Sequence, residues 1–220
     1  MKQLTIAIDG FSSTGKSTLA RQLAYKLNFT YVDSGAMYRA ITLYFLDHHI
    51  ELSDNVQIVK ALEQIVLTFI DNKISLNGEP VDEQIRSMAI ANLVSEVAAL
   101  KEVRKFAVAQ QQALGEEKAI VMDGRDIGTT VFPKAELKIY LTADEHIRAM
   151  RRCDEMKLKN PSISLDEVVE NLKHRDLIDS TRDVSPLRKA KDAVILDNTA
   201  LTMEQQLEIS YQWAIERMQA

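Results

Sequence analysis

Short apolar runs alternate with longer segments of helical periodicity along most of this chain. Five of the runs are continuous in hydrophobic and β-branched residues, which is typical of strands buried on both faces of a parallel sheet. They are "LTIAI" (4–8), "TYV" (30–32), "AIVMD" (119–123), "LKIYLT" (137–142) and "AVILD" (193–197). Because helical patterns follow most of them, the order predicts an α/β domain with helices on both faces of a central parallel sheet, in three layers.

Two of the helical segments begin with the spacing of a capping box, in which the first and fourth residues bond reciprocally. Ser164 and Glu167 open the first segment, and Thr202 and Gln205 open the second. An apolar stripe at helical spacing then predicts that the second helix packs on the core. The stripe comprises Leu207, Tyr211, Ala214, Ile215 and Met218.

One segment, "VLTFIDNKISLNGEPV" (66–81), breaks the alternation of strands and helices. Two strand-like runs flank Asp71 and Asn72, and a turn containing Gly78 follows. Such a pattern is typical of a β-hairpin. We expect a small antiparallel insertion on the main sheet.

Composition narrows the class of protein. The chain has 220 residues, of which 46% are hydrophobic, so we expect one domain over 1–220 with a sizeable core. A net charge of −5 argues against general nucleic-acid binding, although a locally basic cleft remains compatible with it. The single cysteine, Cys153, excludes an internal disulfide and a metal site built from cysteines, which fits a reducing compartment.

The start of the chain, "MKQLTIAIDG", enters strand-like sequence without the apolar core of a signal peptide. No apolar run approaches the roughly 18 residues that a membrane helix needs. We therefore expect a cytoplasmic protein without a membrane partner.

The stretch "IDGFSSTGKSTLARQLA" (8–24) matches G-x-x-x-x-G-K-[ST], between a predicted strand and a predicted helix. Glycines let the backbone N–H groups approach phosphate oxygens, and the helix start adds a positive dipole end. A lysine here reaches the β- and γ-phosphates, and the following hydroxyl ligates Mg²⁺. The flanking elements disfavour a glycine turn that matches by chance. The predicted loop comprises Gly10, Phe11, Ser12, Ser13, Thr14, Gly15, Lys16, Ser17 and Thr18.

Two further stretches carry polar residues next to predicted strand ends, where ligands bind in open α/β sheets. In "VDSGAMYRAI" (32–41), Ser34 is placed as a helix N-cap and Arg39 lies in the first turns. In "VMDGRDIGTTVFP" (121–133), Asp123 ends a strand, and Arg125 and Asp126 follow. Asp123 is expected to bind a Mg²⁺-coordinated water, and the alternative is a turn-forming aspartate before Gly124.

A third stretch, "HRDLIDSTRDVSPLRKA" (174–190), is dense in arginine. Val168, Leu172, Arg175, Asp179 and Arg182 are spaced by 4, 3, 4 and 3 residues, so they share one helix face. A face that changes from apolar to charged predicts a helix that runs from the core into a polar cleft. The alternative is a set of ordinary intrahelical ion pairs, each worth about 0.2–0.5 kcal/mol. The spacing alone leaves both open.

Together these motifs resemble the bacterial cytidylate kinases over nearly the full length of the chain. "DSGAMYR" and "DGRDIGT" carry the resemblance more specifically than the phosphate loop does, and "NGEPV" and "LDNT" extend it. It implies a P-loop kinase core, a nucleoside-monophosphate-binding insertion at roughly 50–90 and a helical LID at roughly 147–165. One departure is "FSST" at 11–14, where relatives carry smaller residues such as Pro and Ala.

The resemblance also implies transfer of the γ-phosphoryl group from ATP to CMP or dCMP, with Mg²⁺. Arg39, Arg125 and Arg182 would hold the CMP phosphate, and Asp179 the ribose. Ser95, Arg104 and Asp126 match positions that recognise cytosine, although sequence alone places Ser95 and Arg104 on solvated helix faces.

The expected site residues fall into four groups. The catalytic group is Lys16, Arg125, Arg175 and Arg182. The CMP-binding group is Ser34, Arg39, Ser95, Arg104, Arg125, Asp126, Arg175, Asp179 and Arg182. The LID or ATP group is Arg148, Arg151, Arg152 and Arg188. The metal group is Ser17, as a direct Mg²⁺ ligand, and Asp123, through water.

Two other functions remain as alternatives. One is a P-loop kinase for another small acceptor, such as UMP, AMP or shikimate. The other is a nucleotide-dependent switch, which the absence of an N-K-x-D motif disfavours. The expected partners are ATP, CMP and dCMP without nucleic acid, and we expect a monomer.

Overall fold

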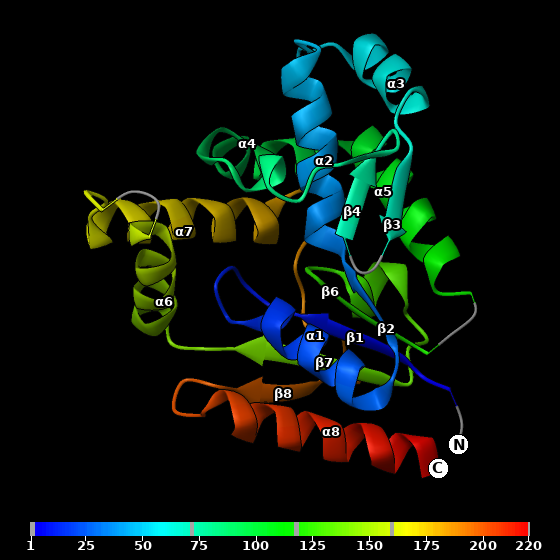
Figure 1. The fold of residues 1–220 in the computed structure, drawn as a ribbon, viewed down its shortest axis with the longest axis vertical. Helices are drawn as coiled ribbons and strands as arrows, with labels where there is room; N and C mark the ends of the chain where they lie inside the picture. The colour runs from blue at the N-terminus through cyan, green and yellow to red at the C-terminus, as the bar shows by residue number, and fades with distance from the viewer. Residues whose placement is uncertain (1–2, 71–72, 117–118, 159–160, 220) are drawn as a thin grey trace.

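The computed structural model describes residues 3–70, 73–116, 119–158 and 161–219. Its centre is a five-stranded sheet in the order β2-β6-β1-β7-β8, in which all neighbours pair in parallel (Figure 1). The strands are β1 (Thr5–Asp9), β2 (Thr30–Asp33), β6 (Ile120–Gly124), β7 (Leu137–Thr142) and β8 (Val194–Asp197). The five predicted strands are thereby confirmed, each to within one residue at either end.

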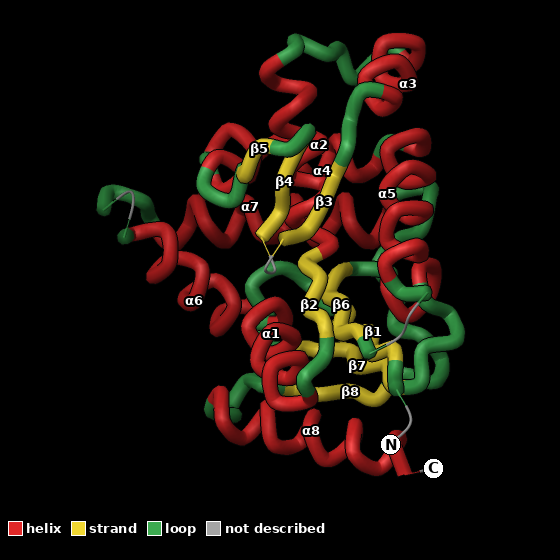
Figure 2. Tube along the Cα trace, turned by 45° about the vertical axis from the view of Figure 1, so that its right-hand side comes forward, coloured by secondary structure: helices red, strands yellow, loops and turns green. Residues whose placement is uncertain are grey.

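Helices cover both faces of this sheet, as the alternation predicts. Successive residues of a strand point to opposite faces, so Ile6 and Ile8 join a core with α1 (Lys16–Leu27) and α8 (Met203–Gln219). Ala7 lies in a different core with the short π-helical turn η2 (Ile127–Val131), beside α5 (Lys101–Leu114). Figure 2 shows α1 and α8 on one side of the strands and α5 on the other.

The expected hairpin is confirmed, but its strands form a sheet of their own. Strands β3 (Leu67–Ile70), β4 (Lys73–Leu76) and β5 (Glu79–Pro80) pair antiparallel, apart from the main sheet. They pack with α2 (Ser34–Asp47), α3 (Asn55–Glu63), the 3₁₀ turn η1 (Gln84–Arg86) and α4 (Met88–Ala99). The turn expected at 71–72 lies outside the described residues. This unit has a second hydrophobic core, which includes Phe45, Ile58, Ile74, Ile90 and Val97.

Helices α6 (Glu145–Lys157) and α7 (Leu165–Thr181) project together from one side of the molecule (Figure 1). A small core of Ala149, Cys153, Val168 and Leu172 joins them, so Cys153 is a packing residue. Both capping boxes form: Ser164 and Glu167 bond reciprocally, as do Thr202 and Gln205. Among the described residues, no helix has the length and apolar character that a membrane crossing requires.

Candidate active site

The loop between β1 and α1 wraps around the side chain of Lys16. The lysine Nζ donates a hydrogen bond to Phe11 O at 2.9 Å, and Thr14 Oγ1 donates to the same carbonyl at 3.0 Å. Gly15 has a φ of 87°, a left-handed conformation that favours glycine. The motif thus adopts the expected turn, with α1 beginning at Lys16 and with Thr18 exposed.

The environment of Lys16 favours the arrival of an anion. Burial lowers the pKa of Lys16 to about 7, and the nearby Arg125 lowers it further, against the opposing effect of Asp123. An anionic ligand next to the ammonium group would favour its charged form again. The loop therefore presents a desolvated cation with no carboxylate bonded to it among the described residues.

Ser17 and Asp123, the two residues predicted to hold a metal ion, are in direct contact. Ser17 Oγ donates to Asp123 Oδ2 at 2.8 Å, and the Tyr31 hydroxyl donates to Asp123 Oδ1 at 2.9 Å. Burial, with help from Asp33, raises the pKa of Asp123 to about 6. The carboxylate faces the phosphate loop instead of closing a turn at Gly124.

The donor set fits Mg²⁺ more closely than a metal held entirely by protein. Mg²⁺ takes oxygen ligands and usually keeps most of its coordination for waters and substrate phosphates. Ser17 and Asp123 supply a hydroxyl and a carboxylate on adjacent elements. Within the described ranges no group of three His, Cys, Asp or Glu side chains could hold a metal ion alone.

The N-cap of α2 is Asp33, so the expectation that Ser34 caps this helix is wrong. Asp33 has extended backbone, and its Oδ1 accepts from Ala36 N at 2.9 Å, because the helix begins at Ser34, one residue earlier than Ser34 capping would require. Asp33 Oδ2 also pairs with Arg39 at 2.8 Å. Ser34 is buried and donates to the Asp123 carbonyl at 2.6 Å, which brings α2 against β6.

Arg125 bridges the phosphate loop and α7. Its Nε donates to Asp179 Oδ2 at 2.7 Å, and its NH2 donates to Ser12 Oγ at 2.8 Å. Burial alone would lower the pKa of Arg125, but Asp179 outweighs it and raises that pKa. The guanidinium is therefore firmly charged beside Lys16.

From Asp179, a charged row of ion pairs continues through Arg182 and Asp126 to Arg104 on α5. Arg182 lies 3.5 Å from a carboxylate oxygen of Asp179 and 3.5 Å from one of Asp126. Asp126 in turn pairs with Arg104, which is 1% exposed. Ser95 on α4 is also buried, so neither Ser95 nor Arg104 lies on the solvated face that sequence alone suggests.

Arg175 lies one turn before Asp179 on α7 and is less completely hydrogen-bonded than Arg125 and Arg182. Its buried Nε has no hydrogen-bond partner among the described residues. Burial, together with Arg125, lowers its pKa to about 10. Along α7, Val168 and Leu172 lie in a hydrophobic core, whereas Asp179 pairs with Arg125 and, three residues along the chain, with Arg182. An incompletely paired guanidinium beside Arg125 gives this point an excess of positive charge, which favours an anionic ligand.

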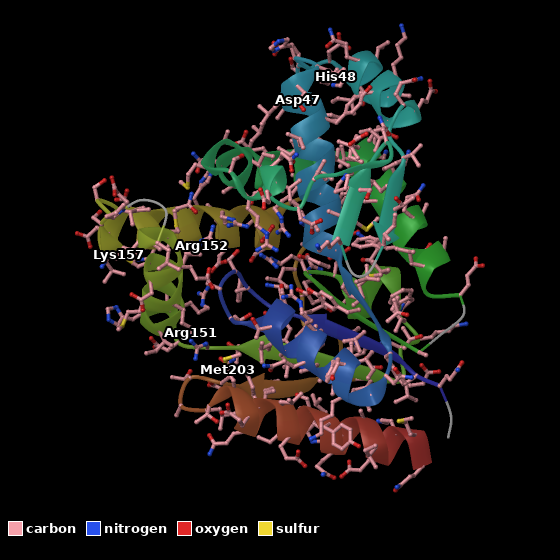
Figure 3. The ribbon with its side chains drawn as sticks, viewed as in Figure 1. Asp47, His48, Arg151, Arg152, Lys157 and Met203 are labelled. Carbon is pink, nitrogen blue, oxygen red and sulfur yellow. The ribbon has the colours of Figure 1, made fainter. Side chains whose placement is uncertain are left out.

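The four arginines expected around a LID have different environments. Arg148 is buried, pairs with Asp176 at 2.7 Å and donates to Ser12 O at 3.1 Å. Arg151 lies in the middle of α6, and its side chain (Figure 3) donates to Asn198 in the β8–α8 connection at 3.0 and 3.1 Å. Arg152 pairs with Glu155 on its own helix, and Arg188 is exposed after α7. Within the part of the chain that the structure describes, Arg148 bonds to the phosphate loop itself and Arg151 bonds to Asn198 next to it, whereas neither Arg152 nor Arg188 makes such a bond.

Asn198, which sequence reasoning missed, follows the edge strand β8 and connects the phosphate loop to α8 by hydrogen bonds. Its Nδ2 donates to Thr14 O at 2.8 Å and to Gln206 Oε1 at 2.7 Å. Asp9 and Asp33 were missed as well. All three lie at or just after the carboxyl end of a parallel strand, which is the signal that could have found them.

Replacing Asn198 with alanine should destabilise the fold by about 1–3 kcal/mol, because the buried Thr14 carbonyl and Gln206 amide lose a partner. Urea unfolding measures the change. Asn55→Ala, at an exposed residue of α3, is the matched control and should change stability by no more than about 0.5 kcal/mol. Equal effects of the two substitutions would contradict the assignment of Asn198 as a structural junction.

Comparison with known proteins gives a consistent family. The model of the cytidylate kinase family matches residues 6–214. A protein named cytidylate kinase from Bacteroides thetaiotaomicron is 54% identical over 217 residues, covering 94% of this chain and 95% of that protein. Another from Flavobacterium psychrophilum is 51% identical over 218 residues, covering 95% and 96%. A third, from Cytophaga hutchinsonii, is 46% identical over 224 residues, covering 99% and 96%.

Solved structures share the fold at much lower sequence identity. A shikimate kinase from Bacteroides thetaiotaomicron matches over 100% of both chains, with a TM-score of 0.50 and 13% identity. An uncharacterized protein from Eubacterium ventriosum matches over 98% of this chain and 99% of its own, with a TM-score of 0.52 and 8% identity. At these identities the likeness concerns the architecture alone.

Proposed function

Because this chain belongs to the cytidylate kinase family, we propose that it transfers the γ-phosphoryl group of ATP to CMP or dCMP, giving ADP and CDP or dCDP. One observation carries the proposal: an unbroken series of contacts links the phosphate loop to the buried Arg104–Asp126 pair. The series runs through Ser12, Arg125, Asp179, Arg182, Asp126 and Arg104. Two nucleotides along this row would meet with their phosphates head to head.

On the donor side, we propose that the N–H groups of residues 10–18 and the Lys16 ammonium bind the ATP phosphates. Mg²⁺ would be held by Ser17 and, through water, by Asp123, where it would neutralise phosphate charge. Arg148 and Arg151 are the stronger candidates for the ATP side, since both already bond next to the loop. Arg152 and Arg188 are left as candidates that reach ATP only on closure of the LID.

On the acceptor side, Arg39, Arg125 and Arg182 are proposed to hold the phosphate of CMP, with Ser34 beside them. Bidentate guanidinium groups suit this anion. Arg175 would stabilise the transferring group, and Asp179 would accept a hydrogen bond from the ribose. Three of these residues, Arg125, Asp179 and Arg182, are consecutive in the series of contacts, which supports a shared position for their roles.

Recognition of cytosine is proposed for Ser95, Arg104 and Asp126. Cytosine offers an N4 amino donor, which a carboxylate accepts, whereas its O2 and N3 atoms accept from hydroxyl and guanidinium groups. Asp126 pairs with Arg104 and Arg182, and an aspartate carboxylate accepts hydrogen bonds but does not donate them. The O4 acceptor of uracil would therefore meet an acceptor, which disfavours UMP.

The transfer needs alignment and charge neutralisation more than covalent chemistry from the protein. No general base is required, because the acceptor phosphate oxygen is already anionic at neutral pH. We further propose that 50–90 is the acceptor-binding insertion and that 147–165 closes as a LID, which would exclude water from the reaction. The chain is proposed to act as a cytoplasmic monomer.

An acceptor panel tests the proposed function. With ATP and Mg²⁺, CMP and dCMP should be phosphorylated with a kcat/KM at least about 100-fold above that of AMP or shikimate, because unpaired polar groups of the site reject the wrong acceptor. A coupled assay of ADP release measures the rates, and removal of Mg²⁺ by EDTA should abolish them.

A higher kcat/KM with UMP, AMP or shikimate would contradict the choice of acceptor. Tight GTP binding without turnover that depends on an acceptor would instead favour a switch module.

A further inference from the structure

Asp9, the last residue of β1, holds a backbone turn that lies 118 residues further along the chain. Its Oδ1 accepts from Ile127 N at 2.7 Å, and its Oδ2 accepts from Gly128 N at 2.7 Å. The side chain is buried, and burial raises its pKa to about 7 although both N–H groups act to lower it. Both carboxylate oxygens are thus used by neighbouring backbone groups.

These two N–H groups open the π-helical turn η2, for which Asp126 is the N-cap residue. The first N–H groups of a helical segment need acceptors, and an aspartate at the N-cap usually supplies one from its own side chain. The Asp126 side chain makes no such bond and instead pairs with Arg104 and Arg182. Asp9 therefore supplies from β1 the cap that Asp126 would otherwise provide.

The hydrogen bond between Asp9 and Gly128 N requires a close approach of the Asp9 side chain to the backbone of η2. A Cβ atom at Gly128 would lie 3.2 Å from Asp9 Oδ2 and 3.1 Å from Lys138 Cδ, which is tighter than ordinary side-chain contacts. Asp9 also directly precedes Gly10, the first residue of the phosphate loop. One residue thus ends the strand that leads into the donor loop and fixes the turn that carries Asp126.

We propose that Asp9 is a positioning residue for the acceptor base: by capping η2 it leaves the Asp126 carboxylate available to the substrate and fixes its place relative to the donor loop. The inference rests on the proposed function and can fail independently of it. An unmodified protein that does not phosphorylate CMP would refute the function, whereas variants that leave base selection unchanged would refute the role of Asp9 alone.

Asp9→Asn tests the proposal, because the amide keeps the size of the side chain but turns an NH₂ group toward one of the two N–H donors. The KM for CMP should rise about tenfold and the preference for CMP over UMP should fall by a similar factor, while the KM for ATP stays within about twofold. Asp144→Asn is the matched control, since Asp144 Oδ1 accepts from His146 N and Ile147 N at the start of α6. This control should retain the selectivity of the unmodified protein.

Gly128→Ala gives a second test that leaves Asp9 intact and should shift the KM for CMP and the CMP preference in the same direction. Hydrogen exchange at the Ile127 and Gly128 amides should accelerate in Asp9→Asn while β1 remains protected. Equal increases in the KM for ATP and CMP, or an unchanged CMP preference in both variants, would overturn the proposal. If Asp9→Asn does not fold, the preference of Gly128→Ala for CMP over UMP decides whether the proposal holds.

Discussion

Replacing Lys16 with methionine should lower kcat by about a thousandfold or more, because it removes a preorganised charge from the transferring phosphate. Methionine keeps much of the length and apolar stem of lysine. Since Lys16 is buried and its pKa is lowered to about 7, the folded protein gains little from its charge before a nucleotide binds. The variant should therefore unfold at the same temperature as the unmodified protein, or at a higher one.

Lys26→Met, on the same helix, is the matched control. Lys26 lies near the other end of α1, pairs with Glu208 at 2.6 Å and covers the ring of Tyr211. Its loss should leave kcat within about twofold, because exposed ion pairs contribute little. Steady-state kinetics measures kcat and thermal melts measure the unfolding temperature of both variants. A kcat of Lys16→Met within about tenfold of that of the unmodified protein would contradict the role of Lys16.

The elements of this fold could be predicted because each is encoded locally. Buried parallel strands appear as continuous apolar runs, and the run at 137–142 coincides with β7. The phosphate loop is likewise contained in nine consecutive residues between a strand and a helix. Capping boxes at Ser164 and Thr202 are short-range features and were also predictable.

The contacts that assemble the site could not be derived in this way, because they join residues far apart in the chain. Nothing in the sequence near Asp9 indicates Ile127 as its partner, and the same holds for Asn198 and Thr14. Ser95 and Arg104 resemble ordinary surface residues of a helix until α4, α5 and α7 are packed together. Their assignment depended on the family resemblance and not on spacing.

Two errors have physical causes that a pattern does not show. Ser and Asp are both good N-caps, so "DS" at 33–34 leaves the first helical residue undecided until the backbone of β2 is in place. The hairpin at 67–76 was expected on the main sheet. It forms a separate sheet because Ile74 and Leu76 bury their side chains in the core of the insertion, beside α2 and α3.

Replacing Arg125 with alanine should lower kcat/KM for CMP roughly a thousandfold or more and leave ATP affinity nearly unchanged. Such a factor corresponds to a loss of several kcal/mol of transition-state stabilisation. Arg125 contributes a full charge where the two phosphates are proposed to meet, and its loss also leaves Asp179 with less compensation. Arg125→Lys should recover only part of the activity, because an ammonium group does not reproduce the guanidinium fork that bonds Asp179 and Ser12 together.

The comparison that decides the placement of Arg125 is between the two substrates. ATP dissociation constants, measured by calorimetry without an acceptor, should change by less than about threefold, whereas kcat/KM for CMP at saturating ATP falls by orders of magnitude. Arg217→Ala, an exposed arginine at the end of α8, should leave both unchanged. Because Arg125 bonds Ser12 of the phosphate loop, an equal loss of ATP affinity would mean that this contact, and not the acceptor phosphate, explains why an arginine occupies this position.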